Sequence, residues 1–497
     1  MLTAAIFVPL AASLVLALAK LDSTDARTVK LLRAGATIAA AVPLLLLAIT
    51  WSRFEGTGGF ELVEHVPWIP TLGIGYTVGV DGVSLPLAAM SALLFTVAIA
   101  YPTDLRGRAR AYFALFLFLQ AASLGVFLAL DLFLFFVFWD VSLVGMYFLI
   151  GVWGHGDAQR SALKFFIYTF AGSLALLLGI IGLFLSTEPR TFDMATIIAQ
   201  QPLSGGGLYA TLVFVGLAVG FAVKTPLVPF HTWLPPAHVD APGPASAVLA
   251  GVLLKMGTYG FVRIPMSMQP DTFARFAFPL GVLAVVAIVY GALVALAQTD
   301  VKRLIAYTSI NHMGYVILGL AAAGAGIGGQ QAAQAVALTG ATVEMVAHGL
   351  ITGVLFLVSG SILSRGHTYE MDAYGGLAAR APVLTAFTTI AAFASLGLPG
   401  LAGFVAEFQI FTGTLAVYPW LAGVGLIGIV VTAALFLRML QKLFLGPLPE
   451  RWAGWSDLGR VETTALTVLL IFVIVIGVAP AWLLDVIDST AGPFVGR

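Results

Sequence analysis

The chain is built mainly from apolar segments that are long enough to cross a lipid bilayer. Its 497 residues are 60% hydrophobic and 10% charged, and the mean hydropathy is +1.01. A helix needs about 20 apolar residues to span the hydrocarbon core. Fourteen such segments lie near residues 2–19, 29–50, 82–101, 111–130, 132–152, 163–186, 207–226, 243–264, 273–298, 303–323, 333–363, 381–417, 419–445 and 462–484. The connections are short, so we predict a single all-α polytopic membrane domain over residues 1–497 with about 14 transmembrane helices.

Several classes of protein are excluded by composition. The sequence has no cysteine, which excludes disulfides, iron–sulfur ligation and thiolate metal sites. The net charge is zero and no basic cluster indicates a nucleic-acid partner. The N-terminus, MLTAAIFVPL, lacks the positive region of a signal peptide and is predicted to be a retained first helix. A cleaved signal ending near Ala17-Leu18-Ala19 is the alternative.

The distribution of lysine and arginine predicts the orientation in the membrane. If the spans alternate in direction, fifteen of the 24 basic residues fall on one side and five on the other. The side richer in lysine and arginine is normally cytoplasmic. An even number of spans then places both termini on the outer side. The longest outer loop, residues 51–81, is rich in glycine and could include short strands, and Asp81 is expected to cap the third span.

The seventh span is interrupted by a charge and two prolines. The stretch LAVGFAVKTPLVPF, residues 217–230, places Lys224 within an apolar run, followed by Pro226 and Pro229. A charge at membrane depth costs roughly 2.5–3.5 kcal/mol on insertion scales. Proline breaks the helix, and broken backbone is tolerated there only against protein or a water-filled cavity. We therefore predict that Lys224 is a step in a proton path.

The twelfth span is interrupted in a similar way. In ASLGLPGLAGFVAEF, Gly397, Pro399 and Gly400 break the apolar run, and Glu407 follows. Spans four to eight (residues 111–264) and nine to thirteen (272–445) then form two five-helix units of opposite orientation. Broken helices at matching positions of inverted repeats indicate a transport site. We therefore predict two inverted repeats with broken helices 7 and 12.

Other ionisable residues fall within the spans. Asp140 lies about 13 Å along a helix beyond the turn at Asp131, and Lys255 about 16 Å beyond Pro244. The set of candidate proton-translocating residues is Asp140, Lys224, Lys255, His312, Glu344, His348 and Glu407. Because these acids and bases are spread over several helices, they suit a lateral proton wire better than a solute pocket. Lys164, near the cytoplasmic end of the sixth span, is a candidate on the proton-uptake side.

Each of these residues also has a purely structural interpretation. Asp140 could be a protonated acid bonded to a neighbouring helix, and His312 a packed core residue. Glu344 and His348 lie four residues apart and could form only a local hydrogen bond. Lys164 could simply extend to the membrane surface. If Asp140 pairs with Lys224, opposite charges about 4 Å apart attract by about 4 kcal/mol at an effective dielectric constant near 20. Weakening such a pair favours proton release from the buried amine.

The nucleotide-binding interpretation of one motif fails. GAGIGG, at residues 324–329, matches G-x-G-x-x-G, but no strand precedes it and it falls in a loop between helices. The sequence also contains no P-loop. We therefore predict no cofactor-binding and no metal-binding residue in this chain.

Seven segments carry a resemblance to a known family. They are GVDGVSLPL (79–87), MYFLIGVWG (146–154), ALKFFIYT (162–169), FAVKTPLVPFHTWLP (221–235), HVDAPGPASAVLAGVLLKMGTYGFVR (238–263), NHMGYVILG (311–319) and GLPGLAGFVAEF (397–408). Over nearly its whole length the chain resembles the antiporter-like subunits of respiratory complex I, most closely the M type, the counterpart of mitochondrial subunit 4. The resemblance implies proton translocation within an NADH–quinone oxidoreductase of a bacterial inner membrane. NADH, FMN, iron–sulfur clusters and quinone would be bound by other subunits, and the neighbours would be subunits L and N.

The resemblance also implies roles for single residues. Asp140 stands where the family has a glutamate that pairs with the seventh-helix lysine, here Lys224. Lys255 matches the central lysine, Glu407 the exit-side carboxylate, and His312 and His348 match relay positions. Three departures are the shorter side chain of Asp140, Pro236 in place of an aspartate, and Gly145 in place of a proline; Glu344 falls where many relatives are uncharged. The alternatives are a subunit of a multi-component Na⁺/H⁺ antiporter or a membrane-bound hydrogenase, and a non-conducting scaffold.

Overall fold

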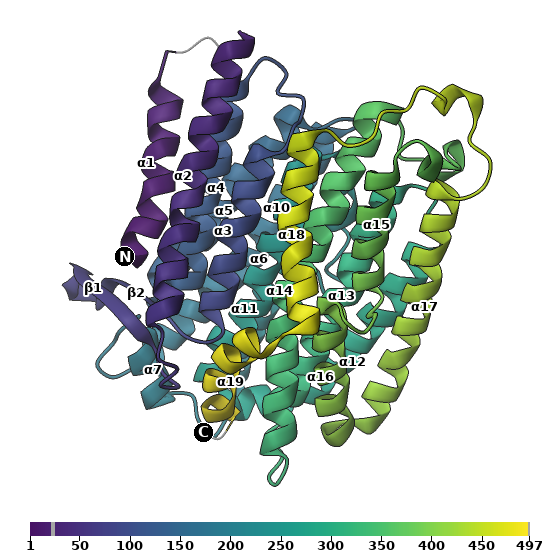
Figure 1. The fold of residues 1–497 in the computed structure, drawn as a ribbon. Helices are drawn as coiled ribbons and strands as arrows, with labels where there is room; N and C mark the ends of the chain where they lie inside the picture. The colour runs from purple at the N-terminus through teal and green to yellow at the C-terminus, as the bar shows by residue number, and fades with distance from the viewer. Residues whose placement is uncertain (21–24, 496–497) are drawn as a thin grey trace.

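The computed structural model describes residues 1–20 and 25–495, and shows one bundle of helices that run between two opposite ends of the molecule (Figure 1). Within these described residues, ten helical segments are long and apolar enough to cross a membrane: α2 (Ala26–Arg53), α4 (Ala109–Leu128), α5 (Leu132–Trp153), α6 (Ala158–Ser186), the run Gly243–Met266, α12 (Pro270–Leu296), α13 (Val301–Ala323), α14 (Gln331–Gly366), α17 (Pro419–Phe444) and α18 (Arg460–Val478). Five shorter apolar helices accompany them: α1 (Leu2–Leu18), α3 (Ser84–Ala100), α8 (Leu208–Lys224), α15 (Pro382–Ser395) and α16 (Ala402–Val417). The predicted all-α membrane fold is confirmed, and the count of fourteen spans stays a prediction.

Aspartates begin several of these helices. Asp131 accepts hydrogen bonds from the amides of Phe133 (2.9 Å) and Leu134 (3.1 Å) at the start of α5. Asp81 caps α3 through the amides of Val83 (3.0 Å) and Ser84 (2.8 Å), as expected. A carboxylate at this position satisfies amides that have no partner within the helix. The turn predicted at Asp131 therefore has a local cause.

Both predicted helix breaks are present. Helix α8 ends at Lys224, and turns lead to α9 (Leu234–Asp240). In the second break, α15 stops at Ser395 and α16 starts at Ala402. Gly397 (φ +74°) and Gly400 (φ +92°) adopt left-handed backbone conformations there, which only glycine takes at little cost. Each break therefore follows from residues that the sequence placed in it.

The run Gly243–Met266 is not a uniform α-helix. It consists of α10 (Gly243–Val248), a π-helical turn η2 (Leu249–Leu253), α11 (Leu254–Phe261) and a second π-helical turn η3 (Val262–Met266). The run is buried along its whole length. Wide π turns inside helices are frequent at functional sites. This run carries Lys255 into the middle of the bundle.

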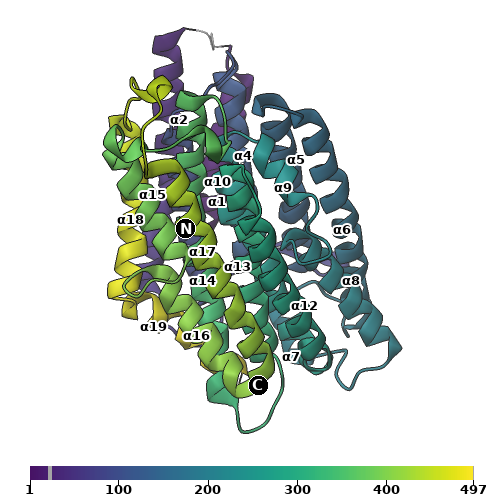
Figure 2. The ribbon, with the colours of Figure 1, turned by 90° about the vertical axis from the view of Figure 1, so that its right-hand side faces the viewer.

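The two groups of helices that were predicted to be repeats lie beside each other. Figure 2 shows α5, α6 and α8 on one side of the molecule, with α14 to α18 on the other and α13 between them. Helix α14 is the long axis of the second group and packs against α13 and α16. The division into inverted repeats at residues 111–264 and 272–445 stays a prediction.

A two-stranded hairpin and two short helices lie at one end of the bundle. β1 (Glu61–Ile69) and β2 (Ile74–Val80) pair as an antiparallel hairpin, with Val66 opposite Tyr76, which confirms short strands in the loop 51–81. The short helix α7 (Met194–Gln200) was not predicted. Helix α19 (Ala481–Val495) was not predicted either. The predicted span 462–484 is too long, because α18 ends at Val478 and the chain turns at Ala479-Pro480 before α19 begins (Figure 1).

Both ends of the described chain lie at this same face of the bundle. The Met1 ammonium contacts Glu64 of β1, and the Gly82 amide, just after β2, donates to Thr490 Oγ1 of α19 at 2.8 Å. Figure 1 shows the N-terminus and the C-terminus towards the end of the bundle that carries the hairpin. Both ends of the described chain therefore lie towards one end of the bundle, and their position on the outer side of the membrane stays a prediction.

The hydrogen bonds to the Glu64 carboxylate lead to a prediction about how the stability of the fold depends on pH. Burial alone would raise the pKa of Glu64, but hydrogen bonds from the Met1 ammonium, Thr3 and the Leu2 amide outweigh it and lower the pKa from 4.5 to about 2. A carboxylate with a depressed pKa stabilises the fold above its unfolded pKa and loses that contribution as the pH falls. We expect Glu64→Gln to be less stable than the parent by a constant amount above about pH 4.5. The melting temperatures of the variant and the parent should converge as the pH falls from about 4.5 to about 2. A difference that stays constant down to pH 2 would contradict the stabilising role of the ionised Glu64 carboxylate.

Candidate functional site

The predicted intramembrane residues lie inside the bundle rather than against lipid. Six of them are at most 5% exposed: Lys224, Lys255, His312, Glu344, His348 and Glu407. Asp140 is half-buried. A buried charge is tolerated only when it is paired and hydrogen-bonded, so the partners of each side chain decide what the cluster can do.

Lys255 and His348 are in direct contact. The Lys255 ammonium lies 2.5 Å from His348 Nδ1 and donates to the Ala250 carbonyl at 2.7 Å. Ala250 belongs to the π turn η2, one turn before the lysine. The contact joins the first group of helices, which carries Lys255, to α14, which carries His348. A proton shared between an amine and an imidazole can move from one to the other.

His312 connects this pair to the carboxylates. Its ring centroid lies 5.2 Å from that of His348. His312 Nδ1 is 3.0 Å from Glu344 Oε1 and 3.9 Å from Glu407 Oε1, while Nε2 is 3.0 Å from Ser395 Oγ. Glu344 and His348 were considered as a local pair, but each instead contacts a residue of another helix. The structure thus brings together Lys255, His348, His312, Glu344 and Glu407.

The second helix break touches this cluster directly. A Cβ atom on Gly397 would lie 2.4 Å from Glu407 Oε2, so only glycine lets the backbone approach the carboxylate this closely. Glu407 lies on α16, just beyond the break, and is 5% exposed. The helix break predicted from the sequence therefore packs directly against the Glu407 carboxylate.

Lys224 has partners other than the one expected. Its ammonium donates to Ser142 Oγ at 3.1 Å and lies 4.7 Å from the centre of the Trp139 ring. Over the described residues no ion pair within 4.0 Å joins Lys224 to Asp140, whose Oδ1 is buried without a hydrogen-bond partner. The expected direct pair is thus wrong for this conformation. Ser142 Oγ takes the place of the expected carboxylate as the hydrogen-bond partner of the ammonium.

The two buried lysines are not joined by a hydrogen bond. Ser142 Oγ, the partner of Lys224, lies 3.9 Å from Met256 Sδ, next to Lys255 in sequence. A thioether is a weak acceptor. Lys164 is exposed on α6, which agrees with the interpretation that it extends to the membrane surface. The structure therefore assembles the second half of the predicted path more completely than the first.

Sequence reasoning missed a second group of buried polar residues. Lys302, one of the fifteen basic residues counted on the cytoplasmic side, is fully buried and donates to the carbonyls of Val239 (3.3 Å) and Ala241. His238 stacks on Phe356 of α14, with ring centroids 4.5 Å apart. Both ring nitrogens of His238 and the hydroxyl of Tyr369 are buried without partners. Such atoms in native interiors are usually satisfied by water.

His155 lies at the outer edge of this second group. Its ring centroid is 5.5 Å from that of Tyr369, and its backbone amide donates to the Asp240 carbonyl at 2.8 Å. Burial, with help from Lys302 and Arg106, lowers the pKa of His155 from 6.5 to about 4. The ring is therefore neutral at physiological pH. A histidine in a loop between spans gave no sequence signal that packing would bury it.

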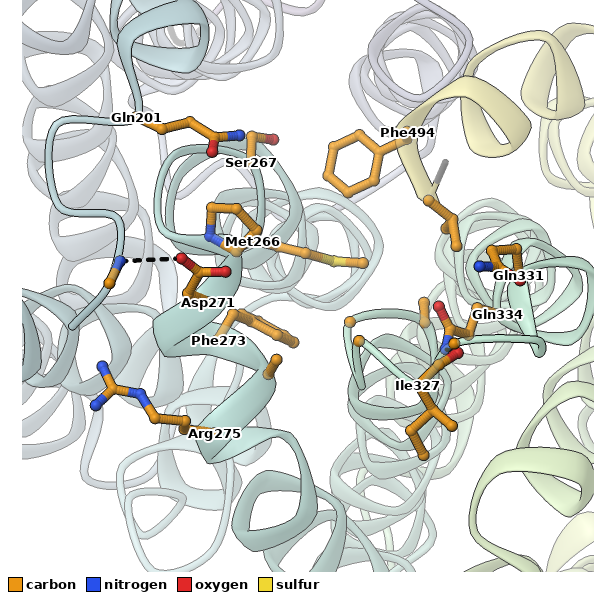
Figure 3. A pocket seen from close by; sticks show the side chains of 18 residues that line it. Gln201, Met266, Ser267, Asp271, Phe273, Arg275, Ile327, Gln331, Gln334 and Phe494 are labelled. Carbon is orange, nitrogen blue, oxygen red and sulfur yellow. Dashed lines mark hydrogen bonds between the residues drawn. The ribbon is translucent and has the colours of Figure 1, made fainter. Parts of the chain in front are cut away.

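A cavity of about 700 Å³ lies away from these residues (Figure 3). It opens between the start of α12 and the loop before α14. Figure 3 shows Asp271 accepting a hydrogen bond from a neighbouring backbone amide, that of Gly205 at 3.0 Å. None of the predicted site residues lines it. The predicted relay is therefore built from packed side chains and not from the walls of this cavity.

A multi-pass bundle with broken helices around a buried series of lysine, histidine and glutamate defines an antiporter-like membrane protein. The family described as NADH:quinone oxidoreductase/Mrp antiporter, TM, matches residues 129–435. The chain belongs to this family. The relatives described next are M-type subunits, to which the chain is similar over most of its length.

Two relatives and two solved structures illustrate the similarity. The chain is 39% identical to NADH-quinone oxidoreductase subunit M of Rhodobacter capsulatus, over 98% of this chain and 95% of the relative. It is 38% identical to F(420)H(2) dehydrogenase subunit M of Methanosarcina mazei, over 89% and 88%. Respiratory complex I from Thermus thermophilus with bound NADH contains a chain with TM-score 0.88 and 29% identity, covering 100% of both chains. A chain of the Mrp complex from Dietzia sp. (TM-score 0.84, 21% identity, covering 99% and 96%) shares the fold.

Proposed function

We propose that this chain is a proton-translocating, M-type membrane subunit of an NADH–quinone oxidoreductase. The observation that carries the proposal is the series Lys255–His348–His312–Glu344, with Glu407 beside His312, which crosses from one group of helices to the other. NADH oxidation and quinone reduction in other subunits would drive the movement. The names of the relatives support this assignment.

The proton would move laterally along this series. A neutral Lys255 takes up a proton, and His348 Nδ1 accepts it across the 2.5 Å contact. His348 Nε2 is buried without a partner, so a water molecule is the natural bridge from it towards His312. His312 then passes the proton to Glu344 or Glu407, and release occurs from Glu407 to the outer side. Each step uses a group that can both accept and donate.

Protons would reach Lys255 from the cytoplasm by two branches. The branch expected from sequence starts near Lys164 and passes Lys224, whose link to Lys255 is interrupted at Met256. The partnerless buried atoms of His238 and Tyr369, near Lys302, support a second, hydrated branch. We infer that this second branch serves Lys255 directly.

The cellular setting follows from charge and family. We propose a bacterial inner membrane, with the face rich in lysine and arginine in the cytoplasm and both termini outside. Neighbours would be the antiporter-like subunits L and N. NADH, FMN, iron–sulfur clusters and quinone would belong to other subunits. Of the alternatives, a subunit of a Na⁺/H⁺ antiporter is supported by the fold shared with the Mrp complex and by the family description, which also names the Mrp antiporter; a subunit of a membrane-bound hydrogenase stays the other alternative.

The decisive experiment replaces one residue in each half of the path. We expect Glu407→Ala to assemble but to lose quinone-linked proton pumping, because it removes a step worth about 10²–10⁴-fold in proton transfer, and Lys224→Ala to assemble and to lose the part of the pumping that its uptake branch supplies. Pumping is measured as acidification of inverted membrane vesicles on NADH addition. Glu450→Ala, at an exposed glutamate outside the spans, is the matched control and should pump normally. Normal pumping by both test variants would refute the mechanism.

A further inference from the structure

His312 makes a hydrogen bond with each of its two ring nitrogens. Nδ1 lies 3.0 Å from Glu344 Oε1, and Nε2 lies 3.0 Å from Ser395 Oγ. An ionised carboxylate can only accept a hydrogen bond, so the neutral ring carries its proton on Nδ1, and Nε2 accepts from the Ser395 hydroxyl. A proton that leaves Nδ1 for Glu344 is therefore replaced at Nε2, and the group bonded to Nε2 is Ser395.

The Ser395 hydroxyl is directed at this histidine rather than at its own helix. A buried serine or threonine within a helix commonly bonds back to the carbonyl one turn earlier. Thr388, also on α15, does so, to the Leu384 carbonyl at 2.7 Å. Ser395 ends α15 and is 2% exposed, and over the described residues the hydrogen-bond partner of its Oγ is His312 Nε2. Because a hydroxyl has one donor and two acceptor positions, Oγ can still accept a hydrogen bond from a water.

His348, which precedes His312 in the relay, has one ring nitrogen that no side chain satisfies. Its Nδ1 contacts Lys255, whereas its Nε2 is buried without a hydrogen-bond partner. The ring centroids of His348 and His312 are 5.2 Å apart. A water that satisfies His348 Nε2 finds no free nitrogen on His312, because both are already hydrogen-bonded. Ser395 Oγ is the group that touches His312 and still has an acceptor position for that water.

The break between α15 and α16 contacts the relay at two points around this ring. Ser395, before the break, contacts Nε2 of His312. Gly397 (φ +74°), within the break, lies so close to Glu407 that a Cβ atom would be 2.4 Å from Oε2. The other oxygen of Glu407, Oε1, is 3.9 Å from His312 Nδ1. One short segment therefore places a hydroxyl at the first nitrogen of the ring and packs against a carboxylate that faces the second.

We propose that Ser395 is a proton-relay residue that delivers protons to His312 Nε2, a role that rests on the proposed function. His348 Nε2 passes a proton to the bridging water, the water passes one to Ser395 Oγ, and the hydroxyl proton of Ser395 passes to His312 Nε2. The imidazolium then releases its Nδ1 proton to Glu344. The water and the hydroxyl are regenerated, and the ring returns to its starting tautomer before the next proton enters.

An isosteric pair of variants tests the hydroxyl in the assembled complex. Ser395→Thr keeps an Oγ atom, whereas Ser395→Val puts a methyl group in its place and leaves no room there for a water. NADH-driven acidification of inverted vesicles, normalised to assembled complex, should be retained by Ser395→Thr and should fall by about 10²-fold or more in Ser395→Val. Thr388→Val makes the same chemical change at an equally buried hydroxyl of α15 and is the matched control, which should pump at the parental rate.

Lys255→Met, measured in parallel, separates a failure at Ser395 from a failure of the proposed function. If Lys255→Met stops pumping but Ser395→Val pumps as well as Ser395→Thr, protons reach Glu344 without entering His312 at Nε2, and the role of Ser395 is wrong. If Lys255→Met also pumps normally, the proposed function itself fails. Should Ser395→Val not assemble, Ser395→Ala removes only the oxygen. Pumping at the parental rate by Ser395→Ala would overturn the proposal, and a loss that Ser395→Thr does not show would support it.

Discussion

Replacing Lys255 by methionine is expected to abolish proton translocation while leaving the chain in the membrane. Methionine is close to lysine in length, and the site is completely buried, so the change removes a costly charge without opening a cavity. It also removes the group that contacts both His348 Nδ1 and the Ala250 carbonyl. We expect a loss of about 10²–10⁴-fold in NADH-driven pumping, the usual contribution of a positioned proton-transfer group.

A second substitution separates proton transfer from electrostatics. Lys255→Arg keeps a positive charge and hydrogen-bond donors, but arginine does not release its proton under these conditions. Both variants should therefore fail to pump, whereas Lys30→Met, at an exposed lysine of α2, should pump normally. Vesicle acidification, normalised to the amount of assembled complex, measures all three. Normal pumping by Lys255→Arg would mean that the lysine acts as a fixed charge and that the relay through its amine is wrong.

The fold could be predicted far into detail because its determinants are local. Apolar length gives the spans, prolines and glycines give the two breaks, and Asp131 gives the turn before α5 through two backbone hydrogen bonds. The predicted C-terminal end of the last span, residue 484, was wrong because its determinant is tertiary and not local. The apolar character continues through Ala479-Pro480, so only the packing of α19 against the bundle shows that the chain turns there.

The composition of the site could be predicted, but its pairings could not. Helical spacing suggested Glu344 with His348, yet the structure pairs His348 with Lys255 and Glu344 with His312. These contacts join residues 93 and 32 positions apart, which no local pattern specifies. Lys224 and Ser142 were likewise brought together by packing between α8 and α5.

The missed residues share one property. Lys302 and His238 lie near the ends of spans, where a charge or an imidazole is normally hydrated. Lys302 is nevertheless fully buried, since residues 239 and 241 fold over it. In the sequence, these buried residues look like solvated residues at the ends of spans. Only the tertiary structure distinguishes a buried residue from a solvated one at such a position.

The largest expected effect on stability is at the buried ion pair of Asp81 and Arg263. Arg263 Nη2 donates to Asp81 Oδ2 at 2.6 Å, and both side chains are 4% exposed. Arg263 Nε also donates to the Tyr259 hydroxyl at 2.9 Å. The pair joins the start of α3 to the π turn η3. The sequence predicted the capping role of Asp81, whereas Arg263 was counted only as one of the five basic residues on the outer side.

Asp81→Ala should destabilise the protein more than any other single charge removal proposed for this chain. It leaves a buried guanidinium without its carboxylate, which costs about 3–5 kcal/mol, and it removes the cap of α3, which costs about 1 kcal/mol. Arg263→Met leaves the carboxylate its two amide partners and should cost less. The measurement is the unfolding midpoint of the purified membrane protein in detergent.

An exposed ion pair provides the matched control for this prediction. Lys442 contacts Asp372 with side chains 28% and 64% exposed, so Lys442→Met should cost less than about 1 kcal/mol. The double variant Asp81→Ala with Arg263→Met should be more stable than Asp81→Ala alone, because no unpaired guanidinium remains buried. If the double variant is as unstable as the sum of the two single changes, the cost lies in the lost packing around η3, and the pair is not what holds α3 in place.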